Sequence, residues 1–330
     1  MRPFKPSLVL AVCTVLAACS SGPTEEEIAV RIDDLRQRSA QYFNSGSYPQ
    51  AYQQAMLGME FTEEDDGELN LLAGHALMMM RNLNDVAASQ SYLEVAQELL
   101  DDYRADLILG EFHQRYGSML HAHALRQRRS IADYPSNNNE QREKEEQLNT
   151  ERFVKAQEHF NQAIELFVIA LSQSPDDLHA LQLISQSYAL TKNYGPARKH
   201  LEHALDILIE SRQYKNRILA TDVKIDLSQE TRLRSELLLD INKEVAIRML
   251  LAGIDNKENA TSAELRQYST ILGLQPENLD ALYGRGLCHY ALGNFALASS
   301  DLELFLGNTA LPFDHPQVQR AFEITSDTAN

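Results

Sequence analysis

The chain has 330 residues, of which 47 are acidic and 30 are Lys or Arg, so its formal net charge at pH 7 is −17. Nucleic acid and anionic membrane surfaces bind clustered Lys and Arg, and this charge argues against both as direct partners. The length is sufficient for a large core or for an extended array of repeats.

The N-terminal segment has the layout of a secretory signal peptide. Arg2 and Lys5 precede an apolar run over residues 8–16, and small residues follow it. The run is far shorter than the about 20 apolar residues that span a bilayer, so a transmembrane anchor is the weaker interpretation. We therefore expect residues 1–18 to be removed and to take no part in the fold.

The residues Leu-Ala-Ala-Cys at 16–19 close this segment and resemble the signal of a bacterial lipoprotein. The resemblance implies that Cys19 is acylated and begins the mature chain. Ser20 stands where this family often carries an Asp that retains a protein at the inner membrane, so the resemblance favours the outer membrane. Several acyl chains hold a protein firmly, whereas a single chain binds only marginally.

Cys288 is the one thiol that remains if Cys13 leaves with the signal and Cys19 is lipidated. A single thiol cannot form an intramolecular disulfide, so the fold must be stable without one. Because Cys288 lies in an apolar helical stretch, we expect a buried and unreactive side chain.

After a tether over residues 19–31, the chain is predicted to be helical almost throughout. Leu and Ala dominate, and no stretch alternates long enough to indicate a strand. A three-residue pattern recurs along the chain: an Ala at position i, an apolar or aromatic residue at i+4, and a small or apolar residue at i+7. This spacing places all three residues on one helical face. This pattern occurs at Ala51-Ala55-Gly58, Ala88-Tyr92-Val95, Ala163-Phe167-Ala170, Ala197-Leu201-Ala204 and Ala298-Leu302-Phe305.

The spacing of these patterns indicates a repeat. Ala163 and Ala197 lie 34 residues apart, and Ala298 follows Ala197 by 101, close to three times 34. The pattern resembles the tetratricopeptide repeat, a helix-turn-helix unit of 34 residues. The resemblance implies an all-α solenoid, because each unit leaves an apolar face that its neighbour covers. Repeats are expected over 32–104, 178–227 and 228–330, the last with a capping helix that Asp314 begins.

Two stretches interrupt the period. Residues 105–177 are predicted to form an extended helical pair with a polar insertion at 130–152. Residues 214–227 are predicted to be a loop, after which Ser228 caps a long amphipathic helix. In the degenerate repeat at 245–276, we place the small residue of the second helix at Ala263.

The resemblance also suggests candidate binding residues. In tetratricopeptide proteins the first helices line a concave groove that takes peptides or partner segments. The residues that project from first helices here are His179, Gln182, Gln186, Tyr283 and Tyr290. The alternative is ordinary groove surface or, for Tyr290, packing against a neighbouring repeat.

Arg126, Arg128 and Arg129 form a basic patch at the end of the long helix predicted from residue 105. They interact favourably with the negative end of the helix dipole, or they dock an acidic partner or phospholipid headgroups near the tether. Both interpretations stay open at this point.

No pattern in the sequence indicates catalysis, a metal or a cofactor. His113, His121 and His123 cluster, and His200 and His203 lie three apart, but no Cys or convincing carboxylate completes either set. There is no nucleophile elbow, phosphate-binding glycine loop or zinc-protease motif. We therefore expect a non-enzyme that holds no cofactor or metal.

The favoured function is a lipid-anchored, periplasm-facing scaffold for cell-envelope proteins, such as an outer-membrane, pilus-assembly or peptidoglycan-enzyme complex. This choice of complexes rests on family analogy. Two other classes stay open: a solute or polymer carrier that uses the groove, and a hydrolase or metal enzyme with its site in residues 105–175. The sequence indicates neither the partner nor the oligomeric state.

Overall fold

The computed structural model describes residues 24–62, 66–80, 82–132, 139–220 and 226–328. Within these ranges the chain forms thirteen α-helices and no strand, and most of the helices pack on the next one along the chain. This arrangement confirms the predicted all-α fold of paired helices. The chain divides into two compact units, residues 1–156 and residues 157–330.

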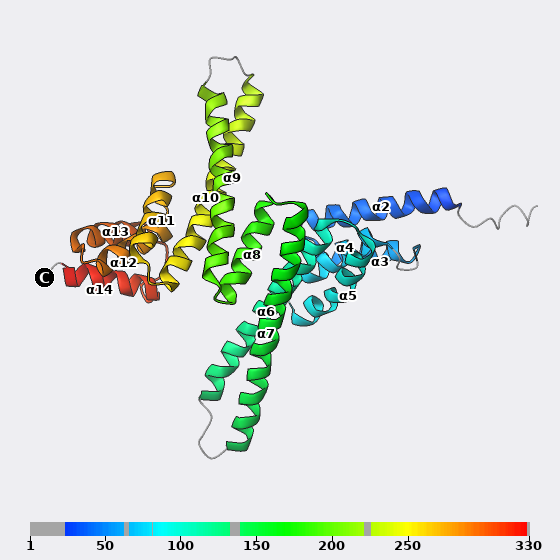
Figure 1. Cartoon of the computed structure of the whole chain (residues 1–330), viewed down its shortest axis with the longest axis horizontal. Coiled ribbons are helices and arrows are strands. Elements are labelled where there is room, and N and C mark those ends of the chain that lie inside the picture. Colours follow the sequence, from blue (N-terminus) through cyan, green and yellow to red (C-terminus); the bar gives the residue numbers. More distant parts are fainter. Residues whose placement is uncertain (1–23, 63–65, 81, 133–138, 221–225, 329–330) are drawn as a thin grey trace, which may run out of the picture. The chain divides into compact units, whose positions relative to one another are not determined.

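The first unit contains two short helical pairs and part of a long one (Figure 1). Its elements are α2 (Glu25–Asn44) with α3 (Tyr48–Met59), α4 (Gly67–Met78) with α5 (Leu83–Leu99), and α6 (Tyr103–Ala132) with the first half of α7 (Asn139–Gln173). Helix α2 begins inside the segment predicted as a tether. The Thr24 side chain accepts from the Glu27 N–H at 3.2 Å while the Glu27 carboxylate accepts from the Thr24 N–H at 2.9 Å, and this capping box starts the helix.

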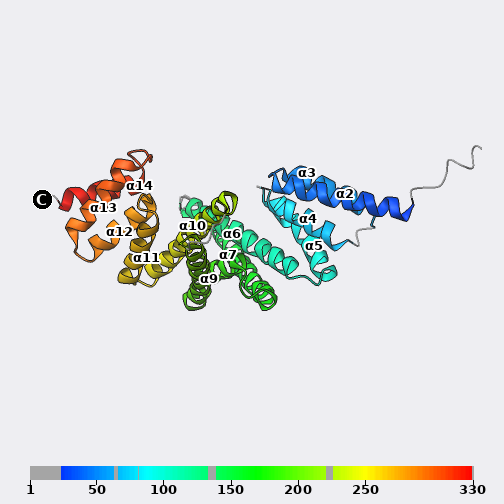
Figure 2. The same ribbon diagram turned by 90° about the horizontal axis from the view of Figure 1, so that it is seen from above.

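The second unit continues with the rest of α7 and seven further helices, all within its described residues. They are α8 (Leu178–Leu190), α9 (Tyr194–Ala220), α10 (Leu227–Lys257), α11 (Thr261–Leu274), α12 (Leu279–Ala291), α13 (Phe295–Asn308) and α14 (Pro316–Thr328). Figure 2 shows α11 to α14 lying side by side at the C-terminal end of this unit.

Small residues mark the points where paired helices cross. Ser39 Oγ donates to the Ala51 carbonyl at 2.8 Å, and Ser185 Oγ donates to the Ala197 carbonyl at 2.9 Å, each across 12 residues. Gly286 precedes Ala298 by the same 12 positions, and a Cβ there would lie only 2.8 Å from Leu302 Cγ. Short side chains at these positions let the two backbones approach closely.

The second repeat has a different buried face from the predicted one. The prediction of Ala88-Tyr92-Val95 as its inward face is wrong, because Ala88 is exposed and Val95 is 37% exposed. The face that packs inward consists of Val86, Ser89, Leu93 and Ala96. Val86 follows Gly74 by 12 residues, so a valine occupies the place that Ala takes in the other repeats.

The degenerate repeat also differs from the prediction. Ala252 of α10 is buried, and the residue 12 positions later that is buried in α11 is Glu264, whereas Ala263 is half-buried. Asn256 Nδ2 donates to both Glu264 carboxylate oxygens at 3.2 and 3.3 Å. A buried carboxylate is tolerated there because it is hydrogen-bonded.

Helices extend into both segments that were predicted to be irregular. Most of the polar stretch 130–152 is helical, supported by i,i+4 pairs such as Arg142 with Glu146. Much of the predicted loop at 214–227 is also helical, because α9 continues to Ala220 and Lys215 Nζ donates to Asp240 of α10 at 2.6 Å.

Two predicted helix starts also shift. Helix α10 starts after Asp226 rather than Ser228, since the Asp226 carboxylate accepts from the Gln229 N–H at 2.8 Å. Helix α14 begins at Pro316, two residues after Asp314. Proline is favoured in a first helical turn, where its missing N–H has no intrahelical acceptor.

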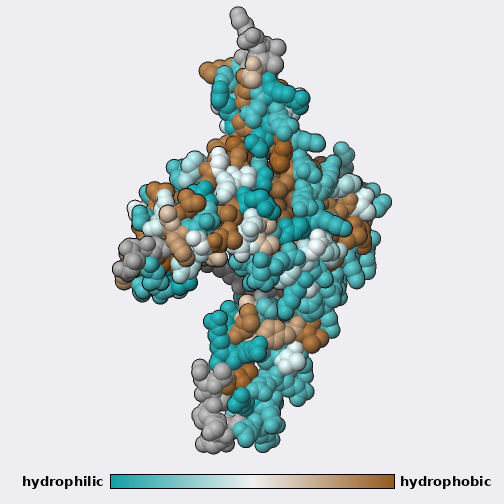
Figure 3. Space-filling model, turned by 60° about the vertical axis from the view of Figure 1, so that its left-hand side comes forward, coloured by the Kyte–Doolittle hydropathy of each residue, from teal (hydrophilic) through white to brown (hydrophobic). Residues whose placement is uncertain are grey.

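The extended α9–α10 pair exposes apolar side chains. Tyr214, Leu227, Leu238 and Leu239 are all more than half exposed. In Figure 3 hydrophobic surface runs along the projecting pair between hydrophilic flanks. Between the two helices, Ser211 Oγ and Lys215 Nζ both donate to the Asp240 carboxylate, which holds the helices in register.

Candidate functional site

An apolar groove of about 430 Å³ lies within the second unit between α8, the start of α9 and the C-terminal half of α10. We call it the α8–α10 groove. From α8 it is lined by Gln186, Ala189 and Leu190, and from α10 by Met249, Leu250, Gly253 and Lys257. Leu190 and Gly253 are exposed there, so apolar surface faces solvent rather than a neighbouring helix.

The walls of this groove follow from the way the sequence distributes its apolar residues. On α8 the fully buried Ile184 faces the core of the repeat, which leaves Gln186 and Leu190 on another face. On α10, Ile247 and Leu251 pack into the core with α9, and Met249 and Gly253 line the groove. Each helix therefore has apolar residues on more than the one face that its pair buries.

An ion-pair cluster holds α9 against α10 next to the groove. Arg198 Nη2 lies 2.7 Å from Asp255 Oδ1 and 2.6 Å from Glu258 Oε2. Asp255 is fully buried, and these carboxylates raise the pKa of Arg198 above its ordinary value despite the opposing effect of burial. The cluster keeps the backbone of α10 at a set position relative to α9.

The structure brings one of the predicted groove residues to this groove. Gln186 lines it, while Gln182 is half-buried and His179 is exposed on the same helix outside the lining. Tyr283 packs with its ring 5.1 Å from that of Phe305, and burial raises its pKa. The binding roles of these residues stay predictions.

Tyr290 has packing partners on two helices. Its ring lies 5.7 Å from that of Phe295, and the Arg320 guanidinium of α14 lies 5.8 Å above the ring. These contacts agree with the packing alternative for Tyr290.

The α10 residues that line the groove, Met249, Leu250 and Gly253, were not predicted from the sequence. A glycine inside a helix, beside consecutive apolar residues, is a sequence signal that could have indicated them.

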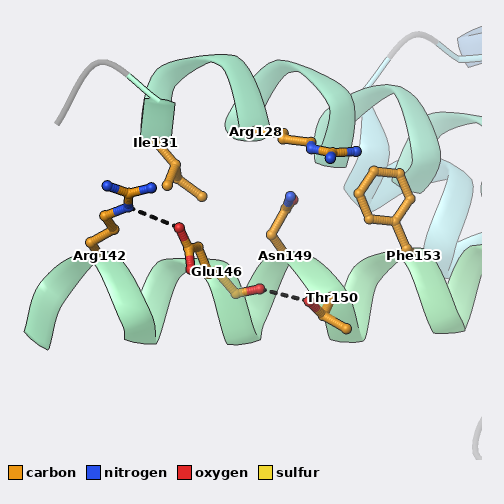
Figure 4. Close-up of a pocket in the computed structure, with 7 residues that line it drawn as sticks. All are labelled: Arg128, Ile131, Arg142, Glu146, Asn149, Thr150 and Phe153. Atoms are coloured by element: carbon orange, nitrogen blue, oxygen red, sulfur yellow. Dashed lines mark hydrogen bonds and ion pairs between the residues drawn. The ribbon is translucent and has the colours of Figure 1, made fainter. Parts of the chain in front are cut away.

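Of the three arginines in the predicted basic patch, only Arg128 lines a cleft. Arg128 lines an open cleft of about 460 Å³ between α6 and α7, together with Arg142 of α7 (Figure 4). Arg126 and Arg129 are exposed and lie outside the lining of this cleft. Docking of an acidic partner on this patch stays a prediction.

Two histidines of the predicted cluster, His113 and His121, pack against aromatic rings. His113 is buried with its ring 4.9 Å from Phe112, and the His121 ring lies 5.2 Å from Phe153. Across the described ranges no group of three or more His, Cys, Asp or Glu side chains could hold a metal.

His200 lies in the second unit, away from that cluster in sequence. Its ring stacks on Tyr188 at 5.8 Å with an interplanar angle of 7°. Burial, and secondarily the nearby His203, lowers the pKa of His200. The His203 Nε2 lies 3.0 Å from the Asp176 carboxylate.

The two cysteine predictions have different outcomes. Cys288 is buried, and burial together with the neighbouring Glu264 carboxylate raises its pKa to about 12, as an unreactive thiol requires. The predicted lipidation at Cys19 lies outside the described residues. In the described part of the chain, no helix is both long and apolar enough to cross a bilayer.

Residues 148–210 match the family model of the tetratricopeptide repeat, and this range covers most of α7, all of α8 and most of α9. Residues 148–210 therefore contain tetratricopeptide repeat sequence, and the chain has the all-α fold of tetratricopeptide solenoids. A solved tetratricopeptide repeat protein from Parabacteroides merdae is similar over 91% of this chain and 99% of its own, with 10% identity and a TM-score of 0.51. At that identity the similarity shows the fold alone.

A second solved structure, YrrB, described as a TPR protein with an unusual peptide-binding site, covers 82% of this chain and 97% of its own. Its sequence identity is 13% and its TM-score is 0.42. No curated protein has a significantly similar sequence. Tetratricopeptide repeat proteins generally act as scaffolds for protein–protein interaction and are usually non-catalytic.

Proposed function

We propose that this protein is a lipid-anchored, periplasm-facing tetratricopeptide scaffold that binds an apolar segment of a cell-envelope protein in the α8–α10 groove. The groove is the observation that carries the proposal. It is open and largely apolar, and the Arg198–Asp255 ion pair links α9 and α10, two of the three helices that bound it.

The groove favours a segment with apolar side chains followed by an acidic group. Burying apolar surface contributes about 25 cal/mol per Å², so two or three side chains set against Met249, Leu250 and Leu190 supply useful affinity. Lys257 is the charged residue of the lining, and a carboxylate of the partner placed beside it would form an ion pair.

The anchor and the location are part of the proposal. The Leu-Ala-Ala-Cys sequence at 16–19, followed by Ser20, supports lipidation of Cys19 and retention at the outer membrane. The partner would then belong to an outer-membrane, pilus-assembly or peptidoglycan-enzyme complex, which rests on analogy with other proteins of this fold.

Crosslinking in intact cells, followed by capture of the protein and identification of its partners, tests both parts. The variant Gly253→Leu places a side chain in the groove where a Cβ meets nothing within 4 Å. Because Leu also favours a helix by about 1 kcal/mol over Gly, loss of the partner would not reflect unfolding. The matched control is Ala246→Leu, an exposed position of α10 outside the lining.

The expected result is a partner captured by the wild type and by Ala246→Leu, reduced about tenfold or more by Gly253→Leu. A Cys19→Ala form should lose envelope partners because it is no longer held at the membrane. Capture that is equal in Gly253→Leu and wild type would place the interaction outside the groove. Capture that is unchanged in Cys19→Ala would contradict the anchor alone.

A further inference from the structure

The cleft between α6 and the N-terminal part of α7 combines positive charge, a buried amide and apolar walls. We call it the arm cleft. Arg128 and Ile131 line it from α6, and Arg142, Glu146, Asn149 and Phe153 are among its α7 residues (Figure 4). Its volume of about 460 Å³ falls in the range of small-molecule sites, about 300–1,000 Å³.

Both arginines of the arm cleft, Arg128 and Arg142, have hydrogen-bond donors that are not used by the residues that the structure describes. Among the described residues, none forms an ion pair or hydrogen bond with the Arg128 guanidinium. Arg142 donates from Nε to Glu146 Oε1 at 2.9 Å, which leaves its two terminal nitrogens uncommitted. A guanidinium presents five donors in a planar fork that matches a phosphate or carboxylate, so these two groups favour an oxyanion.

Asn149 supplies an independent indication that a ligand belongs in the cleft. The residue is only 5% exposed, and its Oδ1 is buried without a hydrogen-bond partner. In Figure 4 the Asn149 side chain points from α7 into the space between the helices, with Arg128 and Arg142 on either side of it. An unpaired buried acceptor costs about 1–3 kcal/mol, and a hydroxyl donated by a ligand would remove that cost.

Other residues limit what the ligand can be. Ile131 is buried and Phe153 is half-buried, so they offer apolar surface to a short carbon skeleton. The Thr150 hydroxyl already donates to the Glu146 carbonyl at 2.9 Å and is not available to donate again. The ligand therefore needs an anionic group, a hydroxyl close to it and a few carbons between them.

We propose that the arm cleft binds a phosphate ester of a small polyol such as glycerol. The phosphate lies between Arg128 and Arg142, a neighbouring hydroxyl donates to Asn149 Oδ1, and the carbon skeleton contacts Ile131 and Phe153. This chemistry is shared by free glycerophosphates and by the headgroups of glycerol-based anionic lipids. The site is in the first unit and is independent of the α8–α10 groove.

The negative charge of the whole chain does not oppose such a site. At physiological ionic strength, exposed charges are screened beyond about 8 Å, so the cleft is governed by its own groups. Arg126 and Arg129 add positive charge on the same helix, and Glu146 is the acidic residue of the lining. Glu146 is therefore expected to weaken binding of the phosphate.

Titration of the purified lipidated protein in a neutral detergent tests the proposal, with glycerol 3-phosphate as ligand and glycerol as the uncharged comparison. Arg128→Ala and Arg142→Ala should each weaken binding about tenfold or more, as expected for lost charge-assisted hydrogen bonds. Arg129→Ala is the matched control, because it removes the same charge from the same helix outside the cleft, and it should change the affinity little. Glu146→Gln should strengthen binding.

Asn149→Leu separates a binding role from a structural one. If Asn149 receives the ligand hydroxyl, this variant loses the preference for glycerol 3-phosphate over inorganic phosphate while its thermal stability rises, because an unpaired buried acceptor is removed. A fall in stability with unchanged preference would overturn the assignment of Asn149. Equal weakening by Arg128→Ala and Arg129→Ala, or no saturable binding, would overturn the site.

Vesicle flotation identifies the source of the phosphate ester. The Cys19→Ala form is used so that acyl chains do not insert, and vesicles contain phosphatidylcholine with or without phosphatidylglycerol. Flotation with phosphatidylglycerol that is lost in Arg128→Ala assigns a lipid headgroup. Binding of glycerol 3-phosphate without flotation assigns a soluble ester.

Discussion

Arg285 and Asp301 form a two-bonded ion pair between α12 and α13, with Arg285 Nε 2.7 Å from one carboxylate oxygen and Nη2 2.7 Å from the other. Asp301 is buried, whereas the Arg285 side chain is 28% exposed. Both hydrogen bonds to the Asp301 carboxylate come from the planar guanidinium of Arg285. Loss of Arg285 would therefore remove both bonds at once.

Arg285→Ala should therefore lower the free energy of unfolding by about 3 kcal/mol, because it leaves the Asp301 charge buried and unpaired. Chemical denaturation measures the loss. Arg38→Ala is the control, since its i,i+4 pair with Asp34 is solvent-exposed on both sides and such pairs contribute about 0–1 kcal/mol. Equal losses in the two variants would contradict the importance of the buried carboxylate.

Gly284 and Gly273 should respond in opposite directions to replacement by Ala. A Cβ at Gly284 would overlap the ring of Tyr268, so Gly284→Ala should destabilise the protein by about 1–3 kcal/mol. A Cβ at Gly273 meets nothing within 4 Å, so Gly273→Ala should be neutral or stabilising by up to about 1 kcal/mol. The melting temperatures of the two variants, compared with that of the wild type, test this prediction. A Gly284→Ala variant as stable as the wild type would show that the Tyr268 ring can move aside.

Cys288 should resist alkylation in the folded protein. Burial raises its pKa to about 12, so the thiolate that reacts with iodoacetamide is scarce at pH 8 and also inaccessible. Peptide mass mapping after treatment should find Cys288 unmodified in native protein and modified in denaturant. Rapid labelling without denaturant would show that α12 opens locally.

Stability should fall in mild acid because of His200. Its pKa is lowered in the folded protein by burial, so protonation favours the unfolded state as the pH drops below about 6.5, the ordinary pKa of histidine. The stabilisation is therefore complete above that pH and is lost as the pH falls through the lowered pKa. Urea denaturation of wild type and His200→Gln across this range should show a flatter pH profile for the variant, and identical profiles would contradict the assignment.

Some local features were predictable and others were not. The Ala197-Leu201-Ala204 pattern identified a buried face correctly, because all three residues are fully buried in α9. In the second repeat the same pattern misplaced the face, since Val86 occupies the position of the Ala and the exposed Ala88 imitates it. A pattern that is read within one helix therefore misplaces the buried face when a larger residue such as Val86 occupies the helix crossing. The error arises because a small residue, Ala88, lies two positions later and fits the pattern equally well.

Glu264 shows a second limit. Sequence reasoning places a carboxylate on the surface, so Ala263 looked like the buried residue of α11. The buried position is nevertheless taken by Glu264, because Asn256 of the preceding helix hydrogen-bonds its carboxylate. That partner lies across a turn and could not be assigned from helical periodicity.

The sequence by itself determined that the protein is an all-α array of paired helices, because the recurring pattern is a local periodicity that acts within each helix. Only the tertiary structure decided which side chains share a surface. Gln186 and Gly253 line one groove although they lie on α8 and α10, and Arg128 and Asn149 line one cleft from α6 and α7. Such encounters depend on how neighbouring helices pack, and packing depends on side chains from all the helices that meet there.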